Sequence, residues 1–313
     1  MARFVITGGA GFIGSHLVEH LLQDQHDVAV LDNFSTGLRE NIQPFLDRIT
    51  LYEVDLRDAA GVEAAVGGAD YVLHQGALPS VPRSIKNPLE THEVNATGTL
   101  NVLAAAKKAG VKRVVYAASS SAYGDSKEQV KHEDIIPKPI SPYGASKLAG
   151  EHYCAAFYQC YGLETVCLRY FNVFGPRQNP NSPYTGVMAI FIPLMLQGKR
   201  PTIYGDGSAT RDFTFIRNNV HANLLAATSP KAPGEMMNIA CGSSYTVLSI
   251  VESINKILGT SIEPIFADPR PGDIKHSCAS VDKAKSILEY EPVVHFEDGL
   301  AETIEWYRRR LNL

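Results

Sequence analysis

The sequence predicts an α/β fold built on a doubly wound parallel sheet, followed by a smaller α/β part toward the C-terminus. Short apolar strands alternate with amphipathic helices over residues 1–171, which is typical of a parallel sheet covered by helices. A glycine-rich turn follows the first strand, and an acidic residue, Asp32, ends the second. From Asn172 the alternation gives way to loops rich in Pro, Asn and Gly, a composition that favours a binding region.

The glycine-rich turn has the spacing of a dinucleotide site. The expected first strand, residues 4–6, leads into Gly8, Gly11 and Gly14 and then into a helix that begins near Ile13. Glycine allows a tight turn here and lets backbone N–H groups approach a pyrophosphate at the helix N-terminus. Asp32 lies at about the separation expected for an acid that holds a ribose diol. Its charge would repel a 2′-phosphate, which favours NAD over NADP.

The remaining strands place further polar residues at one rim of the sheet. Besides a strand at 28–31 and a helix over 95–109, strands are expected at 51–55, 71–74, 114–118 and 165–171. Asp55 is a candidate partner for the adenine amine, whereas His74 is expected to be a core residue. Since ligands bind at the carboxyl ends of parallel strands, Ser119 should share a rim with the glycine turn.

A phenol and an ammonium are predicted side by side on one helix. Pro142 suits the first turn of a helix and Ser141 can cap it, which puts Tyr143 and Lys147 on one face, four residues apart. A free phenol has a pKa of about 10, and a nearby cation lowers it toward the range of a general base. The pair alone is a weak signal, but the glycine turn strengthens it.

Length and composition indicate an ordinary globular enzyme. The 313 residues suggest about two domains, and hydrophobic residues make up 45% of the chain. A net charge of −4 argues against nucleic acid as a partner, and Arg308, Arg309 and Arg310 fit the last turn of a C-terminal helix. Five cysteines without metal-ligand spacing predict buried free thiols and no metal site. A strand that begins by Arg3 and the lack of a long apolar run predict a cytoplasmic protein without a membrane partner.

Together with the glycine turn and Asp32, the residues Ser119, Tyr143, Lys147 and the run 169–172 resemble extended short-chain dehydrogenases/reductases. The chain is more closely similar to NAD-dependent UDP-sugar 4-epimerases, above all those acting on UDP-N-acetylglucosamine, over nearly its whole length. The resemblance implies a Rossmann domain at 1–171 with a returning segment near 212–240, and a discontinuous UDP-sugar domain at 172–211 and 241–313. It also implies a homodimer through helices near 95–109 and 146–161, although Leu100, Leu103 and Phe157 could equally face the sheet.

The resemblance implies three groups of site residues. The catalytic group is Ser119, Tyr143 and Lys147. NAD would be held by Gly8, Gly11, Phe12, Ile13, Gly14, Asp32, Asn33, Ser35, Thr36, Gly37, Asp55, Leu56, Gln75, Ala77, Asn95, Ala117, Tyr143, Lys147, Tyr170 and Val173. The UDP-sugar would be held by Ser80, Ser119, Ser120, Ser121, Tyr143, Asn172, Gln178, Gly186, Val187, Ile203, Tyr204, Arg211, Arg270, Asp273 and Ser277. Arg211 and Arg270 would contact the diphosphate, because a planar guanidinium matches phosphate oxygens.

By this resemblance the reaction inverts C4 of a UDP-hexose through a 4-keto sugar. Ser277 falls where strict UDP-glucose/UDP-galactose epimerases carry a bulky tyrosine, and a small side chain leaves room for a 2-acetamido group. The loop at 80–84 resembles the same subgroup, although Pro79 departs from the small residue expected. UDP-N-acetylglucosamine/UDP-N-acetylgalactosamine are therefore the expected substrates, with UDP-glucose/UDP-galactose also open. An alternative interpretation of Ser277 is that it only caps a turn.

Rival functions on the same fold remain open. A nucleotide-sugar dehydratase or decarboxylase would carry an acid where Ser120 and Ser121 stand. A UDP-glucuronate 4-epimerase would call for a cation near the sugar carboxylate, and Ser277 argues mildly against it. A non-enzymatic NAD-binding regulator would not need intact Ser119, Tyr143 and Lys147. Which of the three serines contacts the reacting hydroxyl also stays open.

Overall fold

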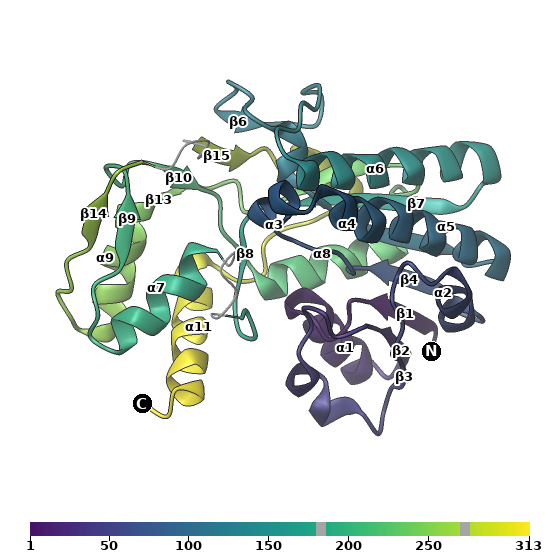
Figure 1. Ribbon diagram of the computed structural model, residues 1–313, viewed down its shortest axis with the longest axis horizontal. Coiled ribbons are helices and arrows are strands. Elements are labelled where there is room, and N and C mark those ends of the chain that lie inside the picture. The colour runs from purple at the N-terminus through teal and green to yellow at the C-terminus, as the bar shows by residue number, and fades with distance from the viewer. Residues whose placement is uncertain (180–185, 270–275) are drawn as a thin grey trace.

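The chain forms a seven-stranded, all-parallel sheet flanked by helices, with a smaller β-containing part beside it (Figure 1). The computed structural model describes residues 1–179, 186–269 and 276–313. The strands of the large sheet lie in the order β12-β7-β5-β4-β1-β2-β3. Their bounds are β1 (Arg3–Thr7), β2 (Asp27–Leu31), β3 (Thr50–Tyr52), β4 (Tyr71–His74), β5 (Arg113–Ser119), β7 (Glu164–Tyr170) and β12 (Met236–Ile239).

The strand order reverses at β1, which defines where a ligand is expected. The chain runs outward from β1 to β2 and β3, then returns to place β4 on the other side of β1. In such a sheet the crevice for a ligand opens at the carboxyl ends of the two strands that flank the reversal. This is the predicted doubly wound fold.

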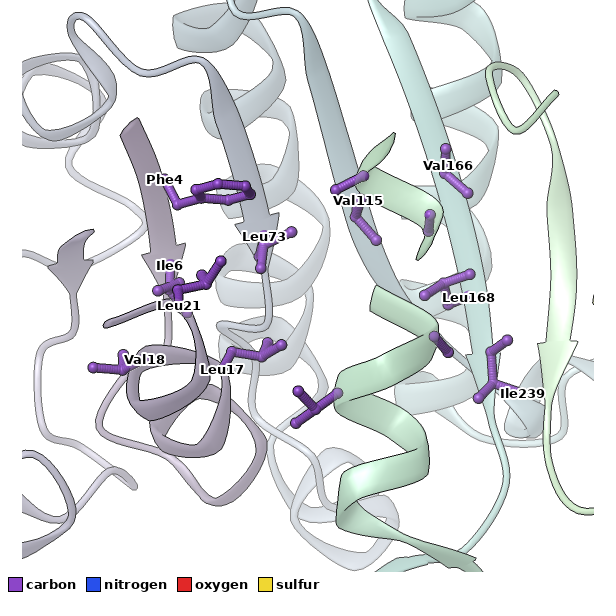
Figure 2. Close-up of a cluster of buried hydrophobic side chains, with 14 of the residues drawn as sticks. Phe4, Ile6, Leu17, Val18, Leu21, Leu73, Val115, Val166, Leu168 and Ile239 are labelled. Carbon is purple, nitrogen blue, oxygen red and sulfur yellow. The ribbon is translucent and has the colours of Figure 1, made fainter. Parts of the chain in front are cut away.

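Helices cover both faces of the sheet because successive strand residues point to opposite sides. Phe4 and Ile6 of β1 pack with Leu17 and Leu21 of α1 (Phe12–Gln23) in one core, to which α8 (Ile216–Thr228) also contributes (Figure 2). On the opposite face, Val5 belongs to a second core. Three helices cover that face: α2 (Ala59–Val66), α5 (Gly98–Ala109) and α6 (Pro142–Tyr161).

A third core supports the smaller part, at the far side of the molecule from β1, β2 and β3 (Figure 1). Its aromatic residues include Phe174, Phe213, Phe215 and Phe296. Its helices are α7 (Val187–Leu196), α9 (Val247–Leu258) and α11 (Phe296–Arg310). Its strands are β8 (Val173–Phe174), β9 (Thr202–Tyr204), β10 (Thr210–Arg211), β11 (Thr214–Phe215), β13 (Tyr245–Thr246), β14 (Ile265–Ala267) and β15 (His276–Ala279).

Two segments pair or pack with the other of the two domains predicted from the sequence. Strand β6 (Val130–Lys131) pairs with β15, in a four-stranded sheet of order β13-β10-β15-β6. In the other direction, β12 pairs with β7 in the large sheet, and α10 (Asp282–Leu288) packs beside β12. The domain division drawn at 171, 212–240 and 241 remains a prediction.

The first part also contains short helical segments that connect to the site. These are α3 (Val81–Lys86), α4 (Pro88–His92), a π-helical turn at Glu93–Thr97 and 3-10 turns at Arg39–Asn41, Gln43–Phe45 and Ser120–Tyr123. The helix expected at 95–109 therefore begins with a π-helical turn, and the strand expected at 51–55 is shortened to β3. Ser141 caps α6 as predicted, accepting a hydrogen bond of 3.1 Å from Gly144 N.

Several smaller expectations are decided by burial. Leu103 and Phe157 are buried in the second core and Leu100 packs against it, so these positions face the sheet and do not support the predicted homodimer. Cys154 and Cys167 are buried free thiols, whereas Cys160 is exposed, contrary to the expected burial, because it lies on the outer side of α6 near the end of that helix. Among the described helices, none is both long and apolar enough to span a bilayer.

Helix α6 packs so closely on β5 that only glycine fits at position 150. A Cβ at Gly150 would lie 2.5 Å from Cζ of the buried Tyr116. We expect Gly150→Ala to lower the free energy of unfolding by about 1–3 kcal/mol, because overpacking outweighs the gain in helix propensity of roughly 1 kcal/mol. Thermal and urea unfolding measure this loss.

Gly67→Ala is the matched control, since the nearest atom to its Cβ is 3.5 Å away and φ is negative. Its effect should stay within about 0.5 kcal/mol of the wild type. Equal stability of the two variants would contradict the close packing of α6 on Tyr116.

Candidate functional site

Polar residues at the ends of five strands meet at the carboxyl edge of the large sheet. Ser119 ends β5 and lies directly across from Tyr170, the last residue of β7. Thr7 ends β1 beside His74 of β4, and Asp32 follows β2. The structure therefore brings the glycine turn, the serine run and the start of the Asn172 loop to the same edge.

The turn between β1 and α1 fits a dinucleotide phosphate. Gly11 is the N-cap of α1 and makes no side-chain cap, so the first-turn N–H groups have no side-chain partner there. The turn is also tightly folded, because a Cβ at Gly14 would overlap the Gly8 carbonyl and lie 2.8 Å from Gly9 Cα. The side chains of Phe12 and Ile13 pack against the third core, so only the backbone of these two residues can face a ligand at the turn.

Asp32 is buried at the end of β2 with both carboxylate oxygens engaged. Oδ2 accepts a hydrogen bond of 2.9 Å from Ala10 N, and Oδ1 accepts one of 2.8 Å from Phe34 N. Burial raises the pKa of this carboxyl, while the two N–H donors lower it. A Cβ at Gly37 would lie 2.9 Å from the carboxylate, so this loop can pass Asp32 only as glycine. Asp32 thus links the glycine turn to the 33–37 loop.

The residues predicted around the adenosine form a second cluster. Asn33 Nδ2 donates to Asp55 Oδ2 at 2.8 Å, and Ser35 N donates to Asn33 Oδ1 at 3.0 Å. Arg57, which the sequence analysis does not single out, donates from Nε and Nη2 to Asp55 at 2.9 and 2.8 Å. This guanidinium lowers the pKa of Asp55 to about 2, so the carboxylate stays charged. Thr36 is exposed and Leu56 buried beside this cluster.

Gln75 and Tyr170 meet through a third residue, Asn223 of α8. Gln75 Nε2 donates to Asn223 Oδ1 at 3.0 Å, and the Tyr170 hydroxyl donates to the same oxygen at 3.0 Å. Burial raises the pKa of Tyr170, so its phenol is neutral and a donor. Asn95 instead points into the protein, where Oδ1 accepts from Leu78 N at 2.7 Å.

His74 is a core residue, as predicted. Its ring nitrogens lie 2.6 Å from Thr7 Oγ1 and 2.9 Å from Thr99 Oγ1. Burial, assisted by the charge of Lys147, lowers the pKa of His74 to about 3, so the ring is neutral. Of the small residues predicted near the cofactor, Ala77 follows the end of β4 and Ala117 lies near the end of β5.

Ser119 and Tyr143 approach each other where α6 begins over the end of β5. The Ser119 hydroxyl lowers the pKa of the Tyr143 phenol, but burial has the larger effect and raises it. The predicted lowering of this pKa is therefore wrong for the protein alone. The physical reason is that the phenol is buried, while the Lys147 ammonium donates to the Ala117 carbonyl at 2.8 Å.

Lys147 is buried and held on two sides. Besides the bond to Ala117 O, its Nζ lies 5.0 Å from the centroid of the Tyr116 ring. Burial lowers the pKa of Lys147 to about 8, and the carboxylate of Glu151 acts in the opposite direction. The ammonium is therefore charged at neutral pH but loses its proton more easily than an exposed lysine.

Three residues predicted for the sugar nucleotide are brought together by Asp212. Arg211 of β10 lies directly across from Ser277 of β15. Asp212 N donates to Ser277 O at 2.7 Å, and Asn172 Nδ2 donates to Asp212 O at 2.8 Å. The Asp212 carboxylate accepts from Cys241 N and Gly242 N at 2.9 and 3.0 Å. Burial raises the pKa of Asp212 to about 6, against these donors.

The remaining predicted substrate residues lie on the surrounding loops. Ser80 caps α3 by accepting a hydrogen bond of 3.0 Å from Arg83 N. Ser121 N donates to Ser119 Oγ at 3.1 Å, and Ser120, between these two residues, begins the 3-10 turn. Gln178 Nε2 donates to Val173 O at 3.3 Å and faces Gly186, which precedes Val187 of α7. Ile203 is buried and Tyr204 exposed on β9. Arg270 and Asp273 lie outside the described residues.

Asp212, Asn223 and Arg57 are the site residues that sequence reasoning missed. Asp212 directly follows Arg211, so an acid beside an arginine predicted to contact the diphosphate is the signal that could have identified it. Asn223 gives no signal of this kind, because its contact with Gln75 joins segments far apart in the chain. Arg57 gives none either, although its partner Asp55 lies only two residues before it.

The chain is similar to known epimerases over its whole length. It is 35% identical to a putative UDP-glucose 4-epimerase of Methanocaldococcus jannaschii, with 97% of this chain and 98% of the relative covered. The structure of a UDP-N-acetylglucosamine 4-epimerase from Methanobrevibacter ruminantium M1, in complex with UDP-N-acetylmuramic acid, matches with a TM-score of 0.94 at 40% identity. The structure of UDP-glucose 4-epimerase from Thermotoga maritima, with UDP-glucose, matches with a TM-score of 0.94 at 38% identity. Each of these two structural matches covers 99% of this chain and 99% of the matched chain.

A family profile agrees with these individual matches. The profile of the NAD dependent epimerase/dehydratase family matches residues 4–240, which hold the glycine turn, Ser119, Tyr143 and Lys147. The predicted fold class, the NAD cofactor and the isomerase class are confirmed by these likenesses. The chain therefore belongs to the NAD dependent epimerase/dehydratase family, as the extended short-chain dehydrogenase/reductase pattern predicts.

Proposed function

We propose that this chain inverts C4 of a UDP-hexose in an NAD-dependent reaction. Its preferred substrates are UDP-N-acetylglucosamine and UDP-N-acetylgalactosamine. UDP-glucose and UDP-galactose are further substrates. The observation that carries the proposal is the approach of the Ser119 hydroxyl to Tyr143, one turn of α6 before the buried ammonium of Lys147. These three groups stand at the edge of the sheet where the glycine turn and Asp32 fit a dinucleotide.

The roles of the three side chains follow from their positions. Tyr143 removes the proton from the sugar 4-hydroxyl and returns it, so it must reach the phenolate state at neutral pH. Burial opposes that state and Ser119 favours it. The positive charge of Lys147, one turn further along α6, is proposed to act in the same direction as Ser119. Ser119 also holds the sugar oxygen in place. NAD, when bound, supplies the acceptor and donor of the C4 hydride, so that the sugar passes through a 4-keto form.

The preference for an acetylated sugar rests on Ser277. It is a small, half-buried residue directly across from Arg211, the residue proposed to contact the diphosphate. The bond from Asp212 N to Ser277 O holds β15 beside β10 at this point. A tyrosine at this position would fill the space proposed for the 2-acetamido group.

The rival reactions find less support. Elimination or decarboxylation on this fold would use an acid next to Ser119, but Ser120 and Ser121 stand there. A uronate substrate would need a cation for its carboxylate. A regulator that only binds NAD would not need Ser119 placed close to Tyr143, one turn of α6 before the buried Lys147.

The decisive experiment is incubation of the purified protein with UDP-N-acetylglucosamine and with UDP-glucose, separately and without added NAD, with the products identified by NMR. We expect the C4 epimer in both cases and faster conversion of the acetylated sugar. If the protein leaves both sugars unchanged while it carries NAD, the proposal is wrong. Activity on UDP-glucose alone would remove only the inference from Ser277.

Tyr143→Phe tests the proposed base. Removal of the hydroxyl should reduce kcat by about 10²- to 10⁴-fold, the usual contribution of a general acid–base, with little change in the affinity for UDP. Turnover and UDP titration calorimetry measure the two effects. Tyr153→Phe is the matched control, because Tyr153 is an exposed tyrosine of the same helix, and it should keep wild-type turnover. Wild-type turnover in Tyr143→Phe would exclude the mechanism.

Ser277→Tyr tests the proposed specificity. We expect kcat/KM for UDP-N-acetylglucosamine to fall by at least ~10-fold, because a steric clash of one side chain costs 1–3 kcal/mol in such a pocket. The same parameter for UDP-glucose should change little. Ser208→Tyr, on an exposed turn ahead of β10, serves as control for the added ring. A parallel fall for both sugars would show that position 277 does not read the acetamido group.

A further inference from the structure

A buried chain of charges continues from Lys147 into the sheet. Glu151 lies one turn further along α6 and is 7% exposed. Its two carboxylate oxygens accept from Nε and Nη2 of Arg169 on β7, at 2.9 and 2.7 Å. Arg169 is 1% exposed, and its guanidinium carbon lies 4.5 Å from the centroid of the Tyr123 ring. Lysine, glutamate and arginine thus follow one another beneath the site.

The position of this ion pair is unusual for a purely structural contact. Burying two charges costs several kcal/mol per ion, and well-packed apolar residues often replace such pairs without loss of stability. Moreover, Nη1 of Arg169 is buried and finds no hydrogen-bond partner among the described residues. The pair is therefore costly to the fold, and the costly arrangement stands next to the ammonium that the reaction uses.

A second arginine–glutamate pair, between β5 and β7, provides the contrast. Arg113 and Glu164 lie opposite each other at the amino ends of these strands, with Nη2 and Oε2 2.7 Å apart. The Glu164 side chain is 42% exposed, so this pair reaches solvent at the edge away from the site. Glu151 and Arg169 instead join α6 to β7 as a pair that is almost fully buried.

We propose that Glu151, fixed by Arg169, is a positioning residue that keeps the Lys147 ammonium charged and in place beneath Tyr143. The proposal rests on the function proposed above, because it gives Lys147 its part in the reaction. Glu151 contacts neither the sugar nor the cofactor in this account. It acts through Lys147, four residues before it on the same helical face.

The groups around Lys147 leave Glu151 as the source of negative charge. From α6 these groups are Tyr143, Glu151 and Cys154, and from β5 and β4 they are Tyr116 and the neutral His74. Arg169 of β7 contacts Glu151, and Cys167 of β7 lies close to Glu151. In the resting protein thiols and phenols are protonated at neutral pH, and burial raises the pKa of Tyr116 and of Tyr143 further. In that state Glu151 is the anion among the described groups named here.

The direction of the effect follows from these charges. Burial lowers the pKa of Lys147 to about 8, and Glu151 raises it against that trend. Removal of the Glu151 charge must therefore lower the pKa of Lys147 further, toward or below neutrality. Removal of both charges of the pair should have a smaller effect, because the repulsion from Arg169 disappears as well.

Glu151→Gln in the NAD-loaded enzyme tests the proposal. The basic limb of the pH profile of kcat, which reports loss of the Lys147 proton, should move to lower pH by about one unit or more, with KM for the UDP-sugar unchanged. Glu164→Gln is the matched control and should leave the profile in place, since it breaks the solvent-exposed pair between β5 and β7. Glu151→Asp should restore part of the shift.

A double variant protects the test against misfolding. Glu151→Gln leaves Arg169 buried without its partner, which can unfold the chain, whereas Glu151→Gln with Arg169→Met removes both charges. In this double variant the basic limb should shift less than in Glu151→Gln, in the same direction. A folded Glu151 variant with the wild-type profile overturns the proposal and leaves the pair a structural one.

A second readout separates the two proposals. NMR titration of protein labelled with ¹³C at lysine Cε, with the Lys147 signal identified by its loss in Lys147→Met, measures the lysine pKa without turnover. A lower pKa in Glu151→Gln supports the inference even if no UDP-sugar is converted, and in that event the proposed function alone fails. An unchanged pKa overturns the inference while epimerase activity stands.

Discussion

The packing of helix α6 against strand β5 is the contact on which the site depends. Gly150 lets the helix approach Tyr116, whose hydroxyl donates to Lys147 O at 3.3 Å. Lys147 in turn donates to Ala117 O of the same strand. Because Ser119 ends β5 and Tyr143 begins α6, the distance between helix and strand sets the geometry of all three proposed catalytic groups.

The substrate side is held together in a different way, through one buried carboxylate. Asp212 connects the turn at Cys241 and Gly242 to β10, and its backbone connects Ser277 to Asn172. Asn172 follows Tyr170, which lies across from Ser119, so the two groups of residues share a continuous set of contacts. A shift in the small sheet would therefore reach the end of β5 through only a few hydrogen bonds.

Much of this arrangement can be predicted from local sequence. The glycine turn, Asp32 and the capped start of α6 depend on residues close together in the chain, and their local chemistry decides their structure. The direction of the Tyr143 pKa could not be predicted in this way, because it depends on how deeply the phenol is enclosed and where the Lys147 ammonium points. The contact of Asn223 could not be predicted for a similar reason, since α8 reaches Gln75 only in the folded chain.

The placement of β12 at the edge of the large sheet has a consequence for how the protein can be divided. This strand comes from a part of the chain far beyond the others, yet it pairs with β7 over residues 167–170. A fragment that ends before residue 236 would expose β7 as an open edge, with unpaired N–H and C=O groups able to recruit other chains. The nucleotide-binding half is thus not a portable module, and a fusion or truncation has to carry the returning strand with it.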